Sequence, residues 1–385
     1  WLLLAMCSNF FHGRPSTDDV PELPDQTLVD GKGGTGKSTV LTFISDEAEE
    51  ADVGMFRTSF NNINALHING HTTCSAVPLA SRKYPNAADS LIVLTNEDIQ
   101  RFKEVTGIRA DGSGTKLIVF EECSNCAPWH LANFSSACQQ VLRNNLPLGG
   151  IKVIFMGDLA QLGPVKAGHT LTEAVLLVSC NNATNRAEID QQNAFRQPPG
   201  CKKLKIPMPK ENNKIFEETH PLTVGSRLFM QSKWFQLSKQ QRAADDPVHT
   251  DFVSRLGDGE PPTMEDIERI KDLSSDDLTE DEWLRALVIV ATNQERILLT
   301  CHRAATLAQQ KNLLVVRWPL KITSDREIDL SDCEDPAHCE HFAPGMECCF
   351  AATLSKHFTI ANAQKAVFHS LIIDEEDDKA LMREA

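Results

Sequence analysis

Residues 31–38 of this chain read GKGGTGKS and match the phosphate-binding pattern GxxxxGK(S/T) without a gap. Two apolar residues, Leu28 and Val29, lead into this loop, and a helical pattern follows it from Lys37. The glycines allow backbone N–H groups to turn inward, where they can surround a phosphate at the N-terminus of a helix. The stretch predicts a strand, a phosphate-binding loop and a helix, and therefore descent from a nucleotide-binding protein.

The side chains of this loop have distinct expected roles. Lys37 places a positive charge beside the β- and γ-phosphates, and the hydroxyl of Ser38 is a ligand for Mg²⁺. The residues expected to bind the nucleotide are Gly31, Gly33, Gly34, Thr35, Gly36, Lys37, Ser38 and Thr39. A flexible glycine-rich turn that binds nothing is the alternative interpretation of the same residues.

Length and composition describe an ordinary globular protein. The 385 residues suffice for about two or three domains, and 41% hydrophobic with 24% charged residues is a typical balance. No apolar stretch approaches the ~20 residues that span a bilayer, so we expect no membrane segment. The net charge of −15 argues against nonspecific adhesion to nucleic acid, although a basic groove can exist on an acidic protein.

The twelve cysteines are scattered through apolar sequence, which indicates reduced thiols and an intracellular protein. Cys123 and Cys126 resemble half of a zinc site, but no second pair follows at ligand spacing. A second group, in a polar segment, consists of Cys333, His338, Cys339 and His341. We expect neither group to bind a metal because the spacing is irregular.

Apolar runs alternate with helical patterns in the first half of the chain, which predicts an α/β domain with a parallel sheet over residues 1–245. The predicted strands are Thr27–Val29, Phe56–Ser59, Lys116–Phe120 and Lys152–Met156, and the predicted helices are Lys37–Glu50 and Trp129–Asn144. Residues 167–214 lack apolar periodicity and contain proline breakers, so we expect an inserted or mobile loop there. Its lysines form either a solvated surface or a contact for nucleic acid.

A second α/β unit is predicted over residues 246–385, after Asp245-Asp246-Pro247. The elements expected in it are strands at Leu287–Ala291, Leu313–Arg317, Glu347–Ala351 and Ala366–Ile373, and a helix from Asn293 to about Gln310. Strands that alternate with a helix place this unit in the same α/β class.

The strand predicted at residues 116–120 runs into two adjacent carboxylates, Glu121 and Glu122. Ligands of open α/β sheets bind at the carboxyl ends of parallel strands, which is where these acids lie. In phosphate-loop NTPases the first acid of such a pair holds Mg²⁺ through water, and the second polarises the attacking water. The alternative is a strand that simply ends in acidic residues facing solvent.

The segment after the predicted strand Lys152–Met156 narrows the class of phosphate-loop NTPase to which the chain could belong. Residues 157–165 read GDLAQLGPV, which resembles the third motif of superfamily-1 helicases. The order and spacing of the motifs resemble the Pif/RecD-like group, which includes the helicases of Helitron transposons. This resemblance implies a P-loop NTPase with two RecA-like parallel-sheet domains that moves 5′ to 3′ on single-stranded DNA.

Further segments extend the resemblance over residues 20–375. Phe235–Ala243 resembles the fourth motif, whose arginine corresponds to Arg242. Gly70–Ser75 resembles the end of motif Ia, which contacts the single strand in the family. The similar stretches of the second domain are Ala291–Asn293 with Arg296, Phe342–Met346 and Ile360–Ala363.

The resemblance implies ATP and Mg²⁺ as cofactors. Glu121 would hold Mg²⁺ through water beside Ser38, and Glu122 would orient the attacking water. Gln161 would sense the γ-phosphate, and Arg242 would stabilise the charge that develops there. The implied catalytic set is Lys37, Glu122, Gln161 and Arg242. The implied partner is single-stranded or forked DNA, in DNA repair, recombination, replication or telomere maintenance, within the nucleus or mitochondrion of a eukaryote.

The chain also departs from the family pattern. The substitutions are Glu121 for an Asp, Asn61-Asn62 for Thr-Gly, Cys74 for a His, Gly163 for a Pro and Asn362-Ala363 for Asn-Gly. Motifs V and VI are not found before Ala385, so we expect the second domain to be incomplete. Three interpretations stay open: an ATP-driven DNA motor, a truncated or degenerate relic that binds ATP without unwinding DNA, and a P-loop scaffold without DNA contact.

Overall fold

The computed structural model describes residues 1–77, 86–161, 163, 169–182, 217–270, 274, 286, 288–290, 292–319, 339–350 and 364–370. The chain divides into two compact units, Trp1–Ile267 and Glu268–Ala385. Sequence analysis predicts this boundary at 245/246, whereas the structure has it after helix α10 (Pro247–Gly257). The later boundary has a physical reason, because Lys32 of the phosphate loop is bonded to α10.

The first unit is built on a sheet of six parallel strands in the order β3-β2-β4-β5-β1-β6. The strands are β1 (Gln26–Gly31), β2 (Met55–Ser59), β3 (His71–Thr72), β4 (Leu117–Glu121), β5 (Lys152–Gly157) and β6 (Lys233–Leu237). Strands β1, β2, β4 and β5 are the four predicted from the sequence, with small shifts at their ends. The predicted α/β class with a parallel sheet is confirmed.

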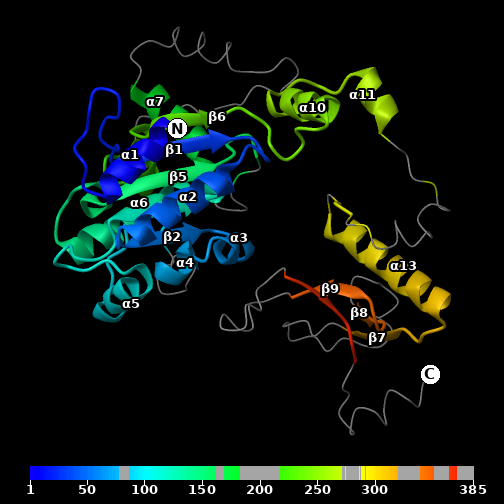
Figure 1. The fold of residues 1–385 in the computed structure, drawn as a ribbon. Coiled ribbons are helices and arrows are strands. Elements are labelled where there is room, and N and C mark those ends of the chain that lie inside the picture. Colours follow the sequence, from blue (N-terminus) through cyan, green and yellow to red (C-terminus); the bar gives the residue numbers. More distant parts are fainter. Residues whose placement is uncertain are drawn as a thin grey trace. The chain divides into compact units, whose positions relative to one another are not determined.

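Helices cover both faces of this sheet (Figure 1). They are α1 (Leu2–Phe11), α2 (Lys37–Glu50), α5 (Asn96–Thr106), α6 (Pro128–Leu142) and α9 (Pro221–Met230). Helices α1 and α2 pack on the face that carries Val29 and Ile154, and the other three on the face that carries Leu28 and Phe155. Neighbouring residues alternate between two apolar clusters, as a strand buried on both faces requires.

The segment predicted as an inserted loop begins as a helix, α7 (Leu171–Asn182). Leu171, Ala174 and Val178 of α7 are buried at helical spacing, a period that the consecutive apolar residues 174–178 conceal in the sequence. The rest of that segment, from residue 183, lies outside the described residues. The remaining described elements of the first unit are α3 (Asn62–His67), α4 (Thr73–Ala76) and short 3₁₀ helices at Cys123–Asn125 and Pro147–Gly150. Helix α11 (Met264–Arg269) spans the boundary between the units.

The second unit contains α13 (Asn293–Lys311) and two antiparallel strand pairs. The pairs are β7 (Val316–Pro319) with β8 (Cys339–Phe342), and β9 (Glu347–Cys349) with β10 (Lys365–Val367). A capping box of Thr292 and Glu295 starts α13 at the predicted residue. Residues 288–290, predicted as part of a strand, are described and are not in one. The described strand pairs of this unit are antiparallel, so a second parallel sheet is not among the described residues.

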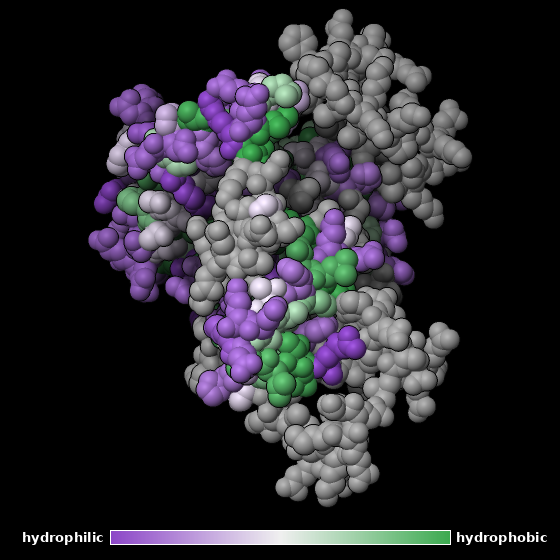
Figure 2. All heavy atoms as spheres, turned by 90° about the vertical axis from the view of Figure 1, so that its right-hand side faces the viewer, coloured by the Kyte–Doolittle hydropathy of each residue, from purple (hydrophilic) through white to green (hydrophobic). Residues whose placement is uncertain are grey.

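Surface polarity varies along the coloured face of Figure 2, where hydrophilic residues surround separate apolar patches. Large apolar side chains that are exposed include Ile289, Leu298 and Leu314 of the second unit. Among the described residues, no helix is both long and apolar enough to cross a membrane.

An aromatic cluster forms the centre of the first unit. The ring of Phe134 on α6 lies 6.1 Å from that of Phe56, 5.4 Å from Phe102 and 5.1 Å from Phe120, between ring centroids. All four side chains are buried. Phe134 therefore joins α5 and α6 to strands β2 and β4.

We expect Phe134→Ala to lower the free energy of unfolding by about 3–5 kcal/mol, because it leaves a cavity among three aromatic rings. The matched control is Phe43→Ala on α2, where the side chain is 37% exposed and the cost is smaller. Urea unfolding of both variants checks this. Equal losses at the two positions would contradict the assignment of Phe134 to the core.

Candidate nucleotide-binding site

The candidate site lies where parallel strands end together. Strand β1 pairs with β5 through Asp30↔Gly157 and with β6 through Gly31↔Leu237. The loop after β1, the turn after β5 and the segment after β6 therefore leave the sheet at the same edge. Strand β4, paired with β5, ends at this edge in Glu121.

The phosphate loop has the predicted strand–loop–helix form. Gly34 and Gly36 have φ of 85° and 93°, in the left-handed region that favours glycine. A side chain at Gly34 would collide with Oε1 of Gln240, so this position also requires glycine for space. Helix α2 begins at Lys37 without a side-chain cap among the described residues, which leaves its first N–H groups for an anion.

The cation predicted to face the phosphates lies inside the loop. Lys37 Nζ donates to the carbonyl oxygens of Gly31 (2.5 Å) and Lys32 (3.3 Å). The hydroxyl of Thr35 donates to the same Lys32 carbonyl at 2.8 Å. Ser38 and Thr39 are exposed in the first turn of α2. The loop thus holds its own ammonium group at the place where a phosphate would need it.

Two acids, Glu121 and Glu122, lie at the end of strand β4 as predicted, and each has a buried carboxyl oxygen. Burial, reinforced by the charge of Glu122 and opposed by Lys37, raises the pKa of the Glu121 carboxyl to about 7. Glu122 has φ of 53°, which costs a non-glycine residue about 1–3 kcal/mol. One buried oxygen of each acid, Oε2, has no hydrogen-bond partner among the described residues. Buried acceptors of this kind point to a missing cation or water.

The turn after β5 presents Asp158 to the loop. Oδ2 of Asp158 accepts from the backbone N–H of Gly33 at 2.9 Å and from Nε2 of Gln161 at 3.3 Å. Its other oxygen, Oδ1, accepts from the N–H of Ala160 at 3.0 Å. Asp158 is buried and Gln161 is exposed. The sequence motif that contains Asp158 predicted no role for this residue. The only sequence signal for such a role is its position two residues after a predicted strand.

The segment after β6 covers the loop. Nε2 of Gln240 donates to the carbonyl of Gly33 at 2.8 Å. The N–H groups of Gln241 and Arg242 donate to the carbonyl of Gly34 at 2.9 and 3.1 Å. The Arg242 side chain is exposed, and its guanidinium has no hydrogen bond or ion pair within the described part of the chain. These three hydrogen bonds were not predictable from the sequence, because they join residues about 200 positions apart.

Lys32 connects the loop to α10. Its Nζ donates to the carbonyl (2.8 Å) and hydroxyl (3.0 Å) of Ser254 and to Oδ1 of Asp258 (2.9 Å). This contact, which sequence analysis did not predict, links the phosphate loop to the last helices of the first unit.

Comparison with known proteins agrees with this geometry. Residues 18–197 match the family model of PIF1-like helicases. The matched range includes the phosphate loop, the two acids of β4 and the turn after β5, whereas Arg242 lies beyond it.

The relatives extend well beyond the matched region. ATP-dependent DNA helicase PIF1 of Mus musculus and that of Homo sapiens are each 28% identical over 138 residues, 36% of this chain. The match spans 19% and 20% of their lengths. A solved structure of Pif1 helicases that unwind forked dsDNA has a TM-score of 0.51 at 14% identity, over 90% of this chain and 68% of that chain. At this level of identity, the likeness shows a shared fold alone.

The segments expected to contact a single strand lie after β2 and around β3. The side chain of Asn61 accepts from the N–H of Ile63 at 2.9 Å and caps α3. Thr58 and Thr73 share a buried hydrogen bond of 2.9 Å between their hydroxyls. Burial raises the pKa of the Cys74 thiol. Asn61, at one of the positions that depart from the family pattern, thus has a structural role in this chain.

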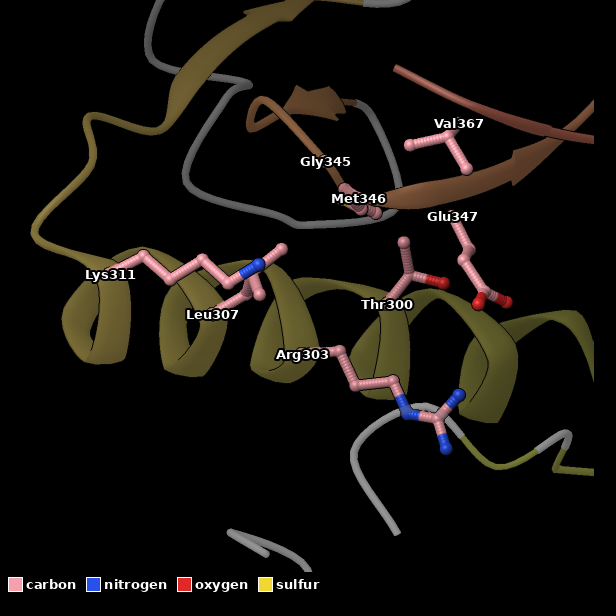
Figure 3. A pocket seen from close by; sticks show the side chains of 8 residues that line it. All are labelled: Thr300, Arg303, Leu307, Lys311, Gly345, Met346, Glu347 and Val367. Atoms are coloured by element: carbon pink, nitrogen blue, oxygen red, sulfur yellow. The ribbon is translucent and has the colours of Figure 1, made fainter. Parts of the chain in front are cut away.

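The second unit carries a cavity of about 290 Å³ between α13 and the β9–β10 pair (Figure 3). The residues that line it are Thr300, Arg303, Leu307, Lys311, Gly345, Met346, Glu347 and Val367. The Arg303 guanidinium is bonded to the carbonyl of Ala286. Arg296 is exposed near the start of α13, and Asn362-Ala363 lies outside the described residues.

The two groups of cysteine and histidine were not expected to bind a metal. Within the described parts of the chain, no three His, Cys, Asp or Glu side chains lie where they could together hold an ion. Cys123 and Cys126 are buried thiols, and burial raises the pKa of each. Cys333 and His338 lie outside the described residues. His341 lies 3.5 Å from the sulfur of Cys301 through Nε2.

The raised pKa of Glu121 predicts a pH dependence of stability. Between about pH 4.5 and 7 the folded chain holds a proton on Glu121 that the unfolded chain has lost, so stability falls as pH rises. Solvent at this partly exposed carboxyl screens the effect, so we expect wild type to lose roughly 2–4 °C in Tm relative to Glu121→Gln between pH 5 and 8. Melting both proteins across this range checks the sign. A constant difference in Tm would contradict it.

Proposed function

We propose that this chain is an ATP-dependent DNA helicase or translocase that couples ATP hydrolysis to 5′-to-3′ movement on single-stranded DNA. The observation that carries the proposal is the convergence of the phosphate loop, two acids with unpartnered oxygens, Gln161 and Arg242 at one edge of a parallel sheet. The PIF1-like family match over residues 18–197 supports it. Forked or single-stranded DNA is the proposed partner.

Mg·ATP fits the residues present. The N–H groups that follow Gly33 in the loop, from Gly34 to Gly36, would surround the β-phosphate, and Lys37 would lie beside the β- and γ-phosphates. Oxygen donors suit Mg²⁺, which keeps several waters, so the Ser38 hydroxyl and the unpartnered Oε2 of Glu121 fit a hydrated ion. When bound, Mg²⁺ would supply charge neutralisation to the phosphates.

The proposed catalytic roles follow the positions of the side chains. Glu122, strained at the end of β4, would orient and deprotonate the attacking water. Gln161, beside Gly33, would donate to the γ-phosphate. Arg242, whose backbone is bonded to the loop, would stabilise the charge that develops during transfer. The N–H of Arg242 is bonded to the loop carbonyl of Gly34, so a displacement of the loop would also displace Arg242.

The proposed setting is cellular DNA metabolism. Two relatives that this chain matches over 138 residues are named ATP-dependent DNA helicases, which supports a role in repair, recombination, replication or telomere maintenance. In a eukaryote the protein would then act in the nucleus or mitochondrion. The first compact unit, with its six-stranded parallel sheet, would be one RecA-like domain, and the second unit would belong to another.

Loss of the loop ammonium tests nucleotide binding. We expect Lys37→Ala to weaken Mg·ATP binding at least tenfold, because one charge beside the β- and γ-phosphates disappears. The control is Lys116→Ala, an exposed lysine before β4, which should bind as wild type does. Isothermal titration calorimetry measures both, and equal affinity of wild type and Lys37→Ala would refute the assignment of the loop.

Glu122→Gln tests the hydrolytic step. The amide keeps the size of the side chain but cannot accept the proton of water, so we expect ATP binding within about twofold of wild type and turnover reduced by 10²–10⁴-fold. Glu104→Gln on α5 is the exposed control. Wild-type turnover by Glu122→Gln would show that another group activates the water.

A second candidate, ATP binding without motor activity, is favoured by the structural use of Asn61 as the cap of α3 at a position expected to contact DNA. ATP hydrolysis with and without a single-stranded oligonucleotide separates the two candidates. Stimulation by the oligonucleotide supports the motor, and its absence in a chain that hydrolyses ATP supports the relic.

A further inference from the structure

One oxygen of Asp158 binds two donors that the proposed nucleotide site needs. The backbone N–H of Gly33, in the phosphate loop, donates to Oδ2 at 2.9 Å, and Nε2 of Gln161 donates to the same atom at 3.3 Å. A Cβ placed on Gly33 would lie 3.9 Å from that Gln161 nitrogen, so the two donors face a common point. That point is filled by a carboxylate oxygen of the protein itself.

Asp158 Oδ2 is an anionic oxygen that accepts from two N–H donors, and a bound phosphate oxygen would have the same arrangement. Helix α2, which begins at Lys37, would bind the β-phosphate at its N-terminus, and Gly33 lies earlier in the loop, beside Gln161. We propose that the Asp158 carboxylate is an internal substitute for the γ-phosphate and sets the preference of the site between nucleoside triphosphate and diphosphate. This inference rests on the proposed nucleotide-binding function.

The substitution discriminates by competition. A triphosphate must take both donors from Asp158 and brings its terminal negative charge next to a carboxylate, which opposes binding. A diphosphate ends at the β-phosphate and leaves both bonds in place. Asp158 therefore weakens triphosphate binding selectively. When the bond between Asp158 and Gln161 breaks, Nε2 of Gln161 becomes available to donate to the γ-phosphate.

Asp158 is held firmly enough to compete. It directly follows β5, is 6% exposed, and its Oδ1 accepts from the N–H of Ala160 at 3.0 Å. The N–H of Leu159 donates to Oδ1 of Asp30 at 3.3 Å and fixes the same turn from the end of β1. Asn at position 158 would retain an oxygen for Ala160 while it removes the charge and the acceptor that face Gly33, so the turn itself should persist.

The test measures the Kd of Mg·ATP and Mg·ADP for the full chain and for Asp158→Asn by calorimetry. We expect the ratio of ATP to ADP affinity to rise about tenfold in the variant, with ADP affinity within twofold, because a charged acceptor is exchanged for a neutral amide. Asp89→Asn, at an exposed position, should leave the ratio unchanged. An unchanged ratio in Asp158→Asn would overturn the inference, whereas a wild-type chain that binds neither nucleotide would refute the proposed function as well.

A measurement on the wild-type chain keeps the inference testable if the variant does not fold. With glycine-selective ¹⁵N labelling, the amide resonance of Gly33 should keep its position with Mg·ADP and shift with a non-hydrolysable Mg·ATP analogue. A Gly33 shift of equal size with both nucleotides would overturn the inference. A loop whose glycine resonances respond to neither would count against nucleotide binding.

Discussion

The pairing of β1 between β5 and β6 is the constraint on which the candidate site depends. In a parallel sheet all carboxyl ends lie on one edge, and the register Asp30↔Gly157 and Gly31↔Leu237 places three loop segments there at the same height. The first carries the phosphate loop, the second Asp158 and Gln161, and the third Gln240 to Arg242. Residues that are more than 200 positions apart thus come into hydrogen-bond contact. A shift of one residue in either register would move the end of one strand along the sheet and invert its side chains, so the loop segments would no longer meet.

The polar groups of this edge largely satisfy one another. Lys37 is held by loop carbonyls, the Gly33 N–H by Asp158, and the loop carbonyls of Gly33 and Gly34 by the segment after β6. Under the proposed function, a nucleotide would therefore have to replace existing hydrogen-bond partners of the loop rather than bind to groups that have none. The exceptions are the Oε2 atoms of Glu121 and Glu122, buried without a partner among the described residues. Under the proposed function, this exchange of partners would link the bound nucleotide to the positions of α10 and of the segment after β6, because both are hydrogen-bonded to the loop.

Local pattern predicted much of the first unit. Glycine spacing between an apolar run and a helical pattern identified β1, the loop and the start of α2 at Lys37, because these features are encoded within about 20 residues. The contacts of Asp158, Gln240 and Lys32 are long-range side-chain choices that one sequence does not encode. Helix α7 was missed because the apolar residues 174–178 are consecutive and show no helical period, although Leu171, Ala174 and Val178 are buried. In the second unit, short apolar runs predicted strands, and the resemblance implied a parallel sheet, whereas the described pairs β7–β8 and β9–β10 are antiparallel. Apolar patterns do not fix strand direction, since parallel and antiparallel pairs share the same residues.

Hydrogen–deuterium exchange, with and without a non-hydrolysable Mg·ATP analogue, would examine the nucleotide site at the level of its segments. Peptides that cover residues 31–38 and 238–242 should exchange more slowly with the analogue, because phosphates bind the loop and the segment after β6 closes on it. Peptides from α5, residues 96–106, should exchange at an unchanged rate. Unchanged exchange in both the loop and the segment after β6 at saturating analogue would contradict a nucleotide site at the edge formed by β1, β5 and β6.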